Sequence, residues 1–244
     1  MPTPLPVAAP MPTEDPATSV EPDMNEDLEM SGEPEPTEEL EEMVMPEPTA
    51  AKLVPGSCTY VGHNQIVVDL GNVASADGWT PVTREGLGGL VYRSDLNEGV
   101  VRPSGAMCFP MKVERAGDYY LTAATYAPHR TENNDFWIRA TKPLRMWKRG
   151  GNTFFDSDAG RYVKAYQNDG ASGISVRMFS KDHDPHRIIV RDVAANESFT
   201  VCVAGRSFRY EVYRVALMRC FKDICTGGQL FKSRVLGMPL SQCI

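Results

Sequence analysis

The first fifty residues contain no lysine, no arginine, no cysteine and no aromatic residue. Fourteen Asp or Glu and eleven of the 19 prolines of the chain lie there instead. Such a segment buries too little apolar surface to offset the conformational entropy that is lost on ordering. We therefore expect residues 1–51 to form a disordered acidic tail.

Other absences narrow the class of protein. No apolar run is long enough for a membrane-spanning helix, and the first residues lack the basic and apolar regions of a secretion signal. The G-x-S-x-G nucleophile motif, the G-x4-G-K-[ST] phosphate loop and recognisable RNA- or DNA-binding signatures are also missing. We expect no catalytic activity, no nucleic-acid partner and no membrane span.

The remaining sequence carries the opposite charge. The whole chain has a formal net charge of -7, yet all 25 Lys and Arg lie in residues 51–244, where they outnumber Asp and Glu by seven. A basic domain attracts anionic partners over long distances. The alternative is that the two opposite charges only keep the chain soluble.

Six cysteines all lie in this basic part. An even number at wide spacing, among short β-type runs, predicts disulfides and hence an extracellular or cell-surface protein. The alternative, which follows from the missing secretion signal, is an intracellular protein with reduced cysteines. The N-glycosylation sequon Asn196-Glu197-Ser198 agrees with secretion. We expect Cys225 and Cys243 to close the C-terminal extension, and the other four to link strands or termini: Cys58, Cys108, Cys202 and Cys220.

The runs from Cys58 onward are short, rich in β-branched and aromatic residues, and separated by Gly, Asn, Asp and Pro, which predicts an all-β antiparallel sandwich or jelly roll. We assign the sandwich to residues 52–220 and a separate extension to residues 221–244. The alternation of the last strand breaks between Val212 and Val215, which indicates a bulge. The expected strands are Gln65–Leu70, Gly89–Arg93, Ala106–Val113, Asp118–Tyr126, Asp135–Arg139, Leu144–Trp147, Val163–Tyr166, Ile174–Phe179, His186–Arg191, Ser198–Ala204 and Tyr210–Met218.

Two segments carry a family resemblance. Gly117-Asp118-Tyr119-Tyr120-Leu121 is similar to the strand that enters the sandwich of galactose-binding-domain-like carbohydrate-binding modules. Arg206-Ser207, followed by the strand around Val215, resembles their closing strand, with Tyr213 where those modules usually have Asp. The resemblance spans residues 58–220. It implies a jelly roll that binds carbohydrate without catalysis, and a structural calcium ion for which Asp69 and Glu85 are the candidate ligands.

A polar loop between two aromatic strands is the first candidate binding site. Sugars are bound by an aromatic plane for their C–H face and by amide, carboxylate or guanidinium groups for their hydroxyls. The alternative is that Trp137 belongs to the core and that Asn133 and Asn134 only cap a turn. The candidate residues are Tyr126, His129, Arg130, Asn133, Asn134, Asp135 and Trp137.

A second group interleaves cations with aromatic rings, a pattern that suits an acidic sugar or a sulfate. The alternative is an ordinary solvated face. Its candidate binding residues are Trp147, Lys148, Arg149 and Tyr166. Asn168, in the expected turn Asn168-Asp169-Gly170, is a further candidate. The pair His183 and His186 around Asp184 is poor metal spacing, because a proline interrupts it and no third ligand stands nearby.

The resemblance implies non-catalytic binding of a carbohydrate, and the basic charge of residues 51–244 favours an acidic or sulfated polysaccharide. The competing class is a structural or assembly protein that uses the same sandwich for contacts with other proteins. A polysaccharide lyase is the third class, and it would require a cleft with paired titratable groups.

Overall fold

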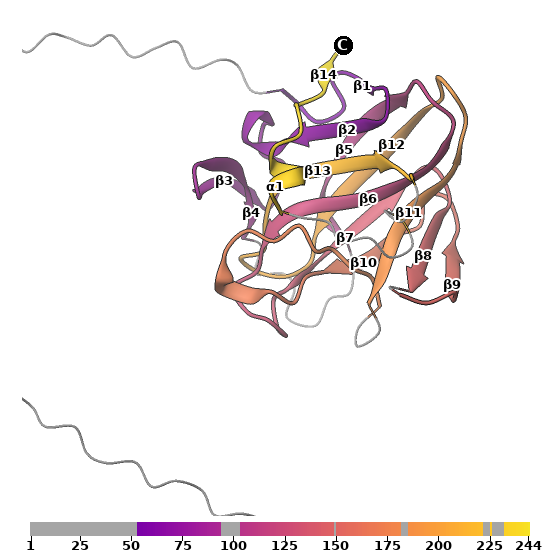
Figure 1. The fold of residues 1–244 in the computed structure, drawn as a ribbon. Coiled ribbons are helices and arrows are strands. Elements are labelled where there is room, and N and C mark those ends of the chain that lie inside the picture. Colours follow the sequence, from indigo (N-terminus) through magenta and orange to yellow (C-terminus); the bar gives the residue numbers. More distant parts are fainter. Residues whose placement is uncertain (1–52, 94–102, 149, 182–184, 222–224, 226–231) are drawn as a thin grey trace, which may run out of the picture. The chain divides into compact units, whose positions relative to one another are not determined.

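The computed structural model describes residues 53–93, 103–148, 150–181, 185–221, 225 and 232–244. Among them two β-sheets pack face to face, and one short helix, α1 (Lys232–Leu236), lies outside the sheets (Figure 1). The all-β sandwich that the sequence predicted is confirmed. The expected disordered tail, residues 1–51, and Arg149 lie outside the described residues.

The first sheet has six strands in the order β10-β7-β12-β5-β1-β14. All its neighbours are antiparallel except β1 and β5, which are parallel. Its strands are β1 (Tyr60–Gly62), β5 (Ser104–Val113), β7 (Asp135–Ala140), β10 (Val163–Tyr166), β12 (Ser198–Gly205) and β14 (Gln242–Cys243).

The second sheet runs in the order β3-β4-β13-β6-β11-β8-β9, with β2 also paired to β13. The predicted bulge is present, because the register between β13 and β6 shifts between Val212 and Arg214. Its strands are β2 (Gln65–Asp69), β3 (Trp79–Arg84), β4 (Leu87–Tyr92), β6 (Gly117–Tyr126), β8 (Leu144–Lys148), β9 (Phe154–Ser157), β11 (His186–Val193) and β13 (Glu211–Arg219). Two short 3-10 turns, η1 (Leu70–Asn72) and η2 (Gly170–Ser172), follow β2 and β10.

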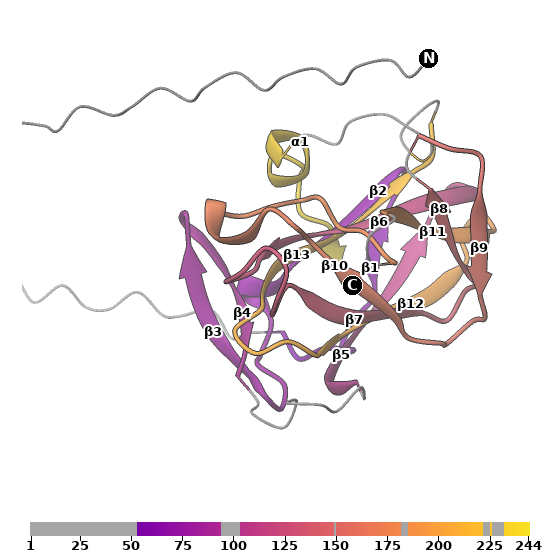
Figure 2. The same ribbon diagram turned by 90° about the horizontal axis from the view of Figure 1, so that it is seen from below.

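Strand alternation creates the core between the sheets. In β5 the residues Met107, Phe109 and Met111 are fully buried, whereas the residues between them are partly exposed. Successive side chains of a strand point to opposite faces, so every second residue enters the core. Figure 2 shows the two layers nearly edge-on.

A second apolar cluster lies on the other face of the second sheet. Val67, Tyr213 and Ala216 of this face are covered by Ile174 and by Val235 of α1. Figure 2 shows α1 on the side of β13 and β6 that faces away from β7 and β12. The expected strand Ile174–Phe179 is not formed among the described residues. The apolar residues that alternate in this segment, Ile174, Val176 and Met178, are buried without forming a strand. The segment makes only the isolated bridges Thr125 to Ser175 and Tyr166 to Phe179.

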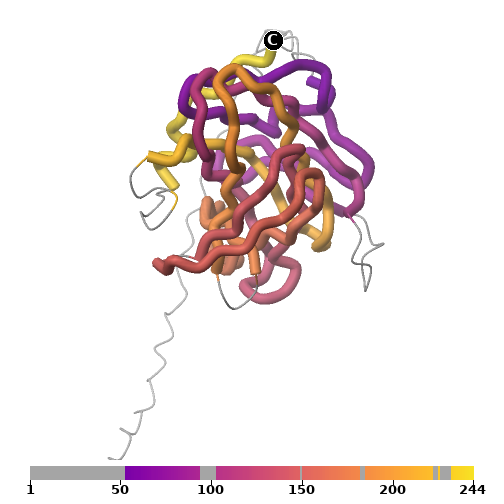
Figure 3. The backbone as a smooth tube through the Cα atoms, turned by 90° about the vertical axis from the view of Figure 1, so that its right-hand side faces the viewer, coloured from indigo at the N-terminus to yellow at the C-terminus, as the bar shows by residue number. Residues whose placement is uncertain are grey.

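All six cysteines are paired, as expected. The pairs are Cys58–Cys243, Cys108–Cys202 and Cys220–Cys225. The C-terminal extension is therefore closed by two separate bonds, one to Cys220 directly after β13 and one to Cys58 before β1, and not by a bond between Cys225 and Cys243. The tube in Figure 3 shows the C-terminal segment beside the start of the described chain.

Candidate functional site

Two loops meet at one end of the sandwich and surround an open depression. One loop, residues 127–134, follows β6, and the other, residues 167–173, follows β10. The depression has a volume of about 540 Å³. It is lined by Pro128, His129, Arg130, Asp169, Ala171 and Ser172.

Buried amides fix the shape of these loops. Gln167 is fully buried, and its Oε1 accepts hydrogen bonds from the backbone N–H groups of Asp169 (2.6 Å) and Gly170 (3.1 Å). Asn134 Nδ2 donates to the carbonyl oxygen of Arg130 (2.7 Å) and to Asn168 Oδ1 (2.9 Å). The walls of the depression are therefore held before any ligand arrives, which lowers the entropy cost of binding.

The side chains of Arg130 and His129 at the depression have nitrogen atoms that are available to bind a ligand. Arg130 is exposed, and its Nε donates to the carbonyl oxygen of Asn168 (3.3 Å). Its two terminal nitrogens, and the exposed ring of His129, have no hydrogen-bond partner among the described residues. Asp169 is different, because its carboxylate accepts from Ser175 Oγ and lies 3.5 Å from Arg177. The depression therefore offers hydrogen-bond donors more than acceptors.

Asp135 stands next to this site but serves the fold. It is 5% exposed, and its carboxylate accepts hydrogen bonds from Arg206 and from Ser207 Oγ. Lys164 Nζ lies 3.5 Å away. The Arg206-Ser207 turn is thereby tied to the start of β7, so this carboxylate is already satisfied and has little capacity for a sugar hydroxyl.

Trp137 lies on the outer face of the first sheet. Its neighbours in β7, Phe136 and Ile138, are the core residues, so the interpretation of Trp137 as core is wrong. Arg206 Cζ lies 5.4 Å from the centroid of its ring, and its buried Nε1 has no partner among the described residues. The indole is half-buried and partly covered, and it does not line the depression.

The two aromatic rings that flank the loops are also engaged. The guanidinium of Arg84 lies over the ring of Tyr126, 3.5 Å from its centroid. Tyr166 is 2% exposed, and its hydroxyl donates to the carbonyl oxygen of Lys181 (2.9 Å). Neither ring is free to stack on a ligand. Asn133 is exposed with a positive φ of 49°, which makes it a turn residue.

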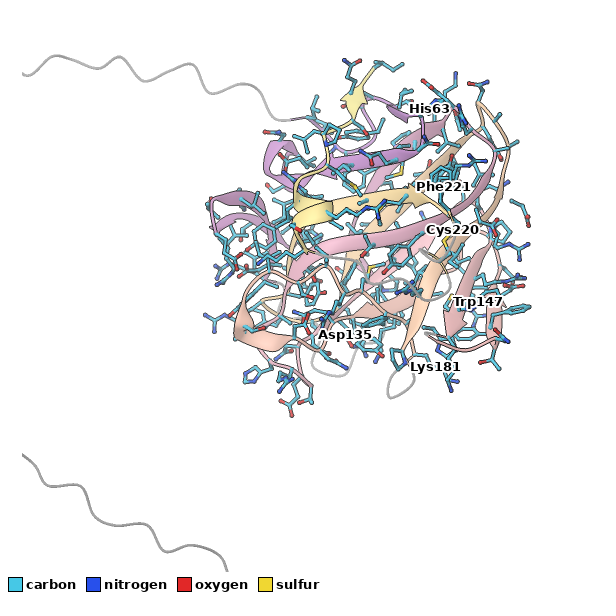
Figure 4. The ribbon with its side chains drawn as sticks, viewed as in Figure 1. His63, Asp135, Trp147, Lys181, Cys220 and Phe221 are labelled. Atoms are coloured by element: carbon cyan, nitrogen blue, oxygen red, sulfur yellow. A yellow bond between two sulfur atoms is a disulfide. The ribbon has the colours of Figure 1, made fainter. Side chains whose placement is uncertain are left out.

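The structure therefore separates the residues that the sequence grouped. His129, Arg130, Asn134 and Asn168 come together at the depression or in its walls. Trp147 and Lys148 lie on β8 of the other sheet, and Figure 4 shows Trp147 and Asp135 well apart. Sequence reasoning missed Asp169 and Ser172, although the turn residues Asn168-Asp169-Gly170 marked their loop.

A second exposed surface is formed by the β8–β9 hairpin. The rings of Trp147 and Phe154 are stacked with centroids 5.5 Å apart, and Arg145 lies over Phe154 at 3.8 Å. Arg145 also donates two hydrogen bonds to Asp156, at 2.7 and 2.8 Å, which lower the pKa of that carboxyl. Phe154 and Phe155 are 48% and 39% exposed. The Phe pair after a Gly-Gly turn was the signal for this surface, and the sequence interpretation did not use it.

The two candidate calcium ligands have other partners. Asp69 caps η1, accepting from Gly71 N–H (3.4 Å) and Asn72 Nδ2 (3.0 Å). Glu85 accepts from Lys232 (2.6 Å) and from Ile174 N–H (2.9 Å), and the bond from Lys232 lowers its pKa. No group of three His, Cys, Asp or Glu suited to a metal occurs among the described residues. The calcium site stays a prediction that this donor set does not support.

No protein-family model and no curated relative matches the chain. Among solved structures, it is similar to the C-terminal CBM6 of a marine laminarinase from Zobellia galactanivorans, at 9% identity and a TM-score of 0.36, over 64% of this chain and 100% of that one. It is also similar to CsCBM6-3 from Clostridium stercorarium in complex with cellobiose, at 12% identity and a TM-score of 0.34, over 67% and 99% of the chains.

A third similar structure has a different description. It is the mosquito-larvicidal Cry4Aa toxin from Bacillus thuringiensis, at 8% identity and a TM-score of 0.38, over 67% of this chain and 25% of that one. At these identities and scores the likenesses concern the strand arrangement alone, and no functional argument rests on them. In the part of the chain that the structure describes, no helix has the length and apolar character that a membrane crossing needs.

Proposed function

We propose that this protein binds carbohydrate without catalysis, through the depression between the loops 127–134 and 167–173. One observation carries the proposal. The terminal nitrogens of Arg130 and the ring of His129 are unused at an open polar depression whose walls are already fixed by Gln167 and Asn134. Preorganised donors at a concave surface are what recognition of hydroxyl and carboxylate groups requires.

An acidic polymer suits these donors better than a neutral one. A guanidinium presents two parallel N–H donors that match a carboxylate or sulfate, and such charge-assisted bonds are about twice as strong as neutral ones. Residues 51–244 also carry an excess of seven positive charges, which raises the local concentration of an anionic polymer. The ligand would be a uronic-acid or sulfated polysaccharide.

The lining of the depression argues against hydrolysis. Hydrolysis of glycosides commonly needs two carboxylates on either side of the bond. Asp169 is the single carboxylate among the lining residues, and Ser175 and Arg177 already bind it. The three disulfides are typical of an oxidising compartment, so we place the protein outside the cell or at its surface.

A second candidate function is protein contact through the β8–β9 hairpin. Its basis is the exposure of Phe154 and Phe155 beside Trp147. Exposed aromatic rings that are flanked by arginine occur at interfaces between proteins. This is the assembly-protein alternative, located on a specific surface.

The test is glycan binding by the intact chain and two arginine variants. We expect wild-type protein to bind an acidic polysaccharide, and Arg130→Ala to weaken binding by about tenfold or more, which is the loss of one charge-assisted contact. Arg161→Ala is the matched control, because Arg161 is exposed before the opposite end of β10.

The control should bind as the wild type does. Equal weakening by both variants would mean that only net charge attracts the polymer. If no acidic or neutral glycan binds, the carbohydrate proposal is wrong and the hairpin becomes the surface to test with protein partners.

A further inference from the structure

The sequence contains a single N-glycosylation sequon, Asn196-Glu197-Ser198. It lies in the turn that joins β11 to β12, and Ser198 is the first residue of β12. Asn196 and Ser198 are both exposed. The two residues that a glycosyl transfer enzyme must reach are thus on the surface of the folded protein.

The backbone of this turn is held while both functional side chains stay available. Asn196 has a φ of 61°, and its N–H donates to the carbonyl oxygen of Val113 (2.8 Å). The carboxylate of Glu197 accepts from Ala194 N–H (2.7 Å) and from Lys142 (2.9 Å). The side-chain amide of Asn196 and the side-chain hydroxyl of Ser198 have no hydrogen-bond partner among the described residues. A modification there breaks no contact of the fold.

The cysteines indicate that the chain passes through the right compartment. All six are paired. The disulfide Cys58–Cys243 spans 185 positions of the sequence, and Cys108–Cys202 spans 94. Long-range structural disulfides form in the secretory pathway and are rare in reducing compartments. N-linked glycans are added in that same pathway.

We propose that Asn196 is an N-glycosylation site. Nδ2 of Asn196 forms a bond to C1 of an oligosaccharide that a polyprenyl diphosphate carries. The bond between C1 and the diphosphate oxygen breaks, the polyprenyl diphosphate leaves, and Nδ2 loses one proton. Nothing is oxidised or reduced in this transfer.

The glycan would lie far from the depression. Strand β12 runs for eight residues from Ser198 to Gly205, a length of roughly 25 Å. Arg206 follows it and contacts Asp135, next to the loop that holds Arg130. In Figure 1 the turn between β11 and β12 and the loops after β6 and β10 lie at opposite ends of the sandwich. Glycosylation should therefore leave ligand access to the depression unchanged.

The experiment is to produce the full chain behind a secretion signal in a eukaryotic host and to measure its intact mass. We expect added hexose and N-acetylhexosamine mass that a peptide N-glycosidase removes, with Asn196 converted to Asp in the peptide map. Asn196→Gln and Ser198→Ala should abolish the added mass completely. Ser198→Thr should keep it, because threonine also completes the sequon.

Asn152→Gln is the matched control, since Asn152 is exposed in another hairpin and has no Ser or Thr two residues later. It should carry the same glycan as the wild type. Secreted wild-type protein that has all six cysteines paired and no added mass would overturn the proposal. Retention of the glycan by Asn196→Gln would also overturn it.

Discussion

Gly170 and Arg130 lie so close that only glycine fits between the two loops. Gly170 has a φ of +61°, and a Cβ built on it would lie 2.4 Å from Arg130 Cγ and 3.1 Å from Arg130 N. These two residues belong to separate loops of the depression. Their contact makes the shape of one loop depend on the backbone of the other.

The first prediction is that Gly170→Ala weakens both stability and glycan binding. The new methyl group forces Arg130 to move. The alanine would also adopt a left-handed backbone conformation, which alone costs about 1–2 kcal/mol. Gly160→Ala is the control, because Gly160 has a φ of +80° with nothing within 4 Å of the added Cβ. Denaturant unfolding and glycan titration should show a larger loss for Gly170→Ala on both measures. If both variants lose the same stability and Gly170→Ala binds glycan as the wild type does, Gly170 does not shape the binding site.

The second prediction concerns the buried carboxylate at the start of β7. Asp135→Asn leaves Arg206 and Lys164 without their common partner, and breaking a largely buried ion pair costs about 3 kcal/mol. Asp156→Asn removes an Arg145 pair whose carboxylate is 50% exposed, so it should cost about 0–1 kcal/mol. The free energy of unfolding, measured with urea, distinguishes the two. Similar costs for both variants would show that the Asp135 network does not stabilise the fold.

The third prediction concerns the link between Glu85, α1 and the segment around Ile174. The hydrogen bond from Lys232 lowers the pKa of Glu85 below its ordinary value of 4.5. A carboxyl with a lowered folded-state pKa contributes stability that is complete above its unfolded-state pKa. That contribution is lost as the pH falls through the folded-state pKa. The difference in melting temperature between wild type and Glu85→Gln should therefore be constant from pH 7 to pH 6 and shrink below pH 4.5.

Lys232→Gln provides the matched control for this prediction, since it removes the partner and keeps the carboxyl. It should lose most of the same pH-dependent contribution. A difference between wild type and Glu85→Gln that stays constant down to pH 3 would exclude titration of Glu85 as its origin.

Strand alternation explains how much of the fold the sequence predicts. Val163–Tyr166 was expected with the bounds that β10 has, and the interruption near Val212 was correctly interpreted as a bulge. Strands β1, β3, β9 and β14 were missed. β1 and β14 have only three and two residues, which is too short for an alternation to show. The exposed positions of β3 are Thr and Pro, and β9 begins with two adjacent exposed Phe residues, so neither strand alternates between apolar and polar residues.

The site was less predictable, because it depends on which loops meet. Arg130 and Asn168 are 38 residues apart in sequence and in contact in the fold. Sequence patterns mark each segment as a polar turn but do not say that they face each other. Alternation also cannot distinguish the outer faces of the two sheets of a sandwich. This is why Trp137 and Trp147 were assigned to one function and lie on different sheets.

The last prediction concerns the acidic segment at the start of the chain. Residues 1–50 carry fourteen carboxylates and no basic residue, so their removal changes the formal charge of the chain from -7 to +7. An anionic polysaccharide is repelled by the whole chain, with its net charge of -7, and attracted by residues 51–244, with a net charge of +7. Deletion of residues 1–50 should therefore tighten binding of a sulfated or uronic-acid polymer at low salt. The gain should fade as added salt shortens the screening length to roughly 8–10 Å. A neutral glucan is the control ligand, and its affinity should not change with the deletion. Equal affinity of both chains for the anionic polymer at low salt would show that the acidic segment has no electrostatic role in binding.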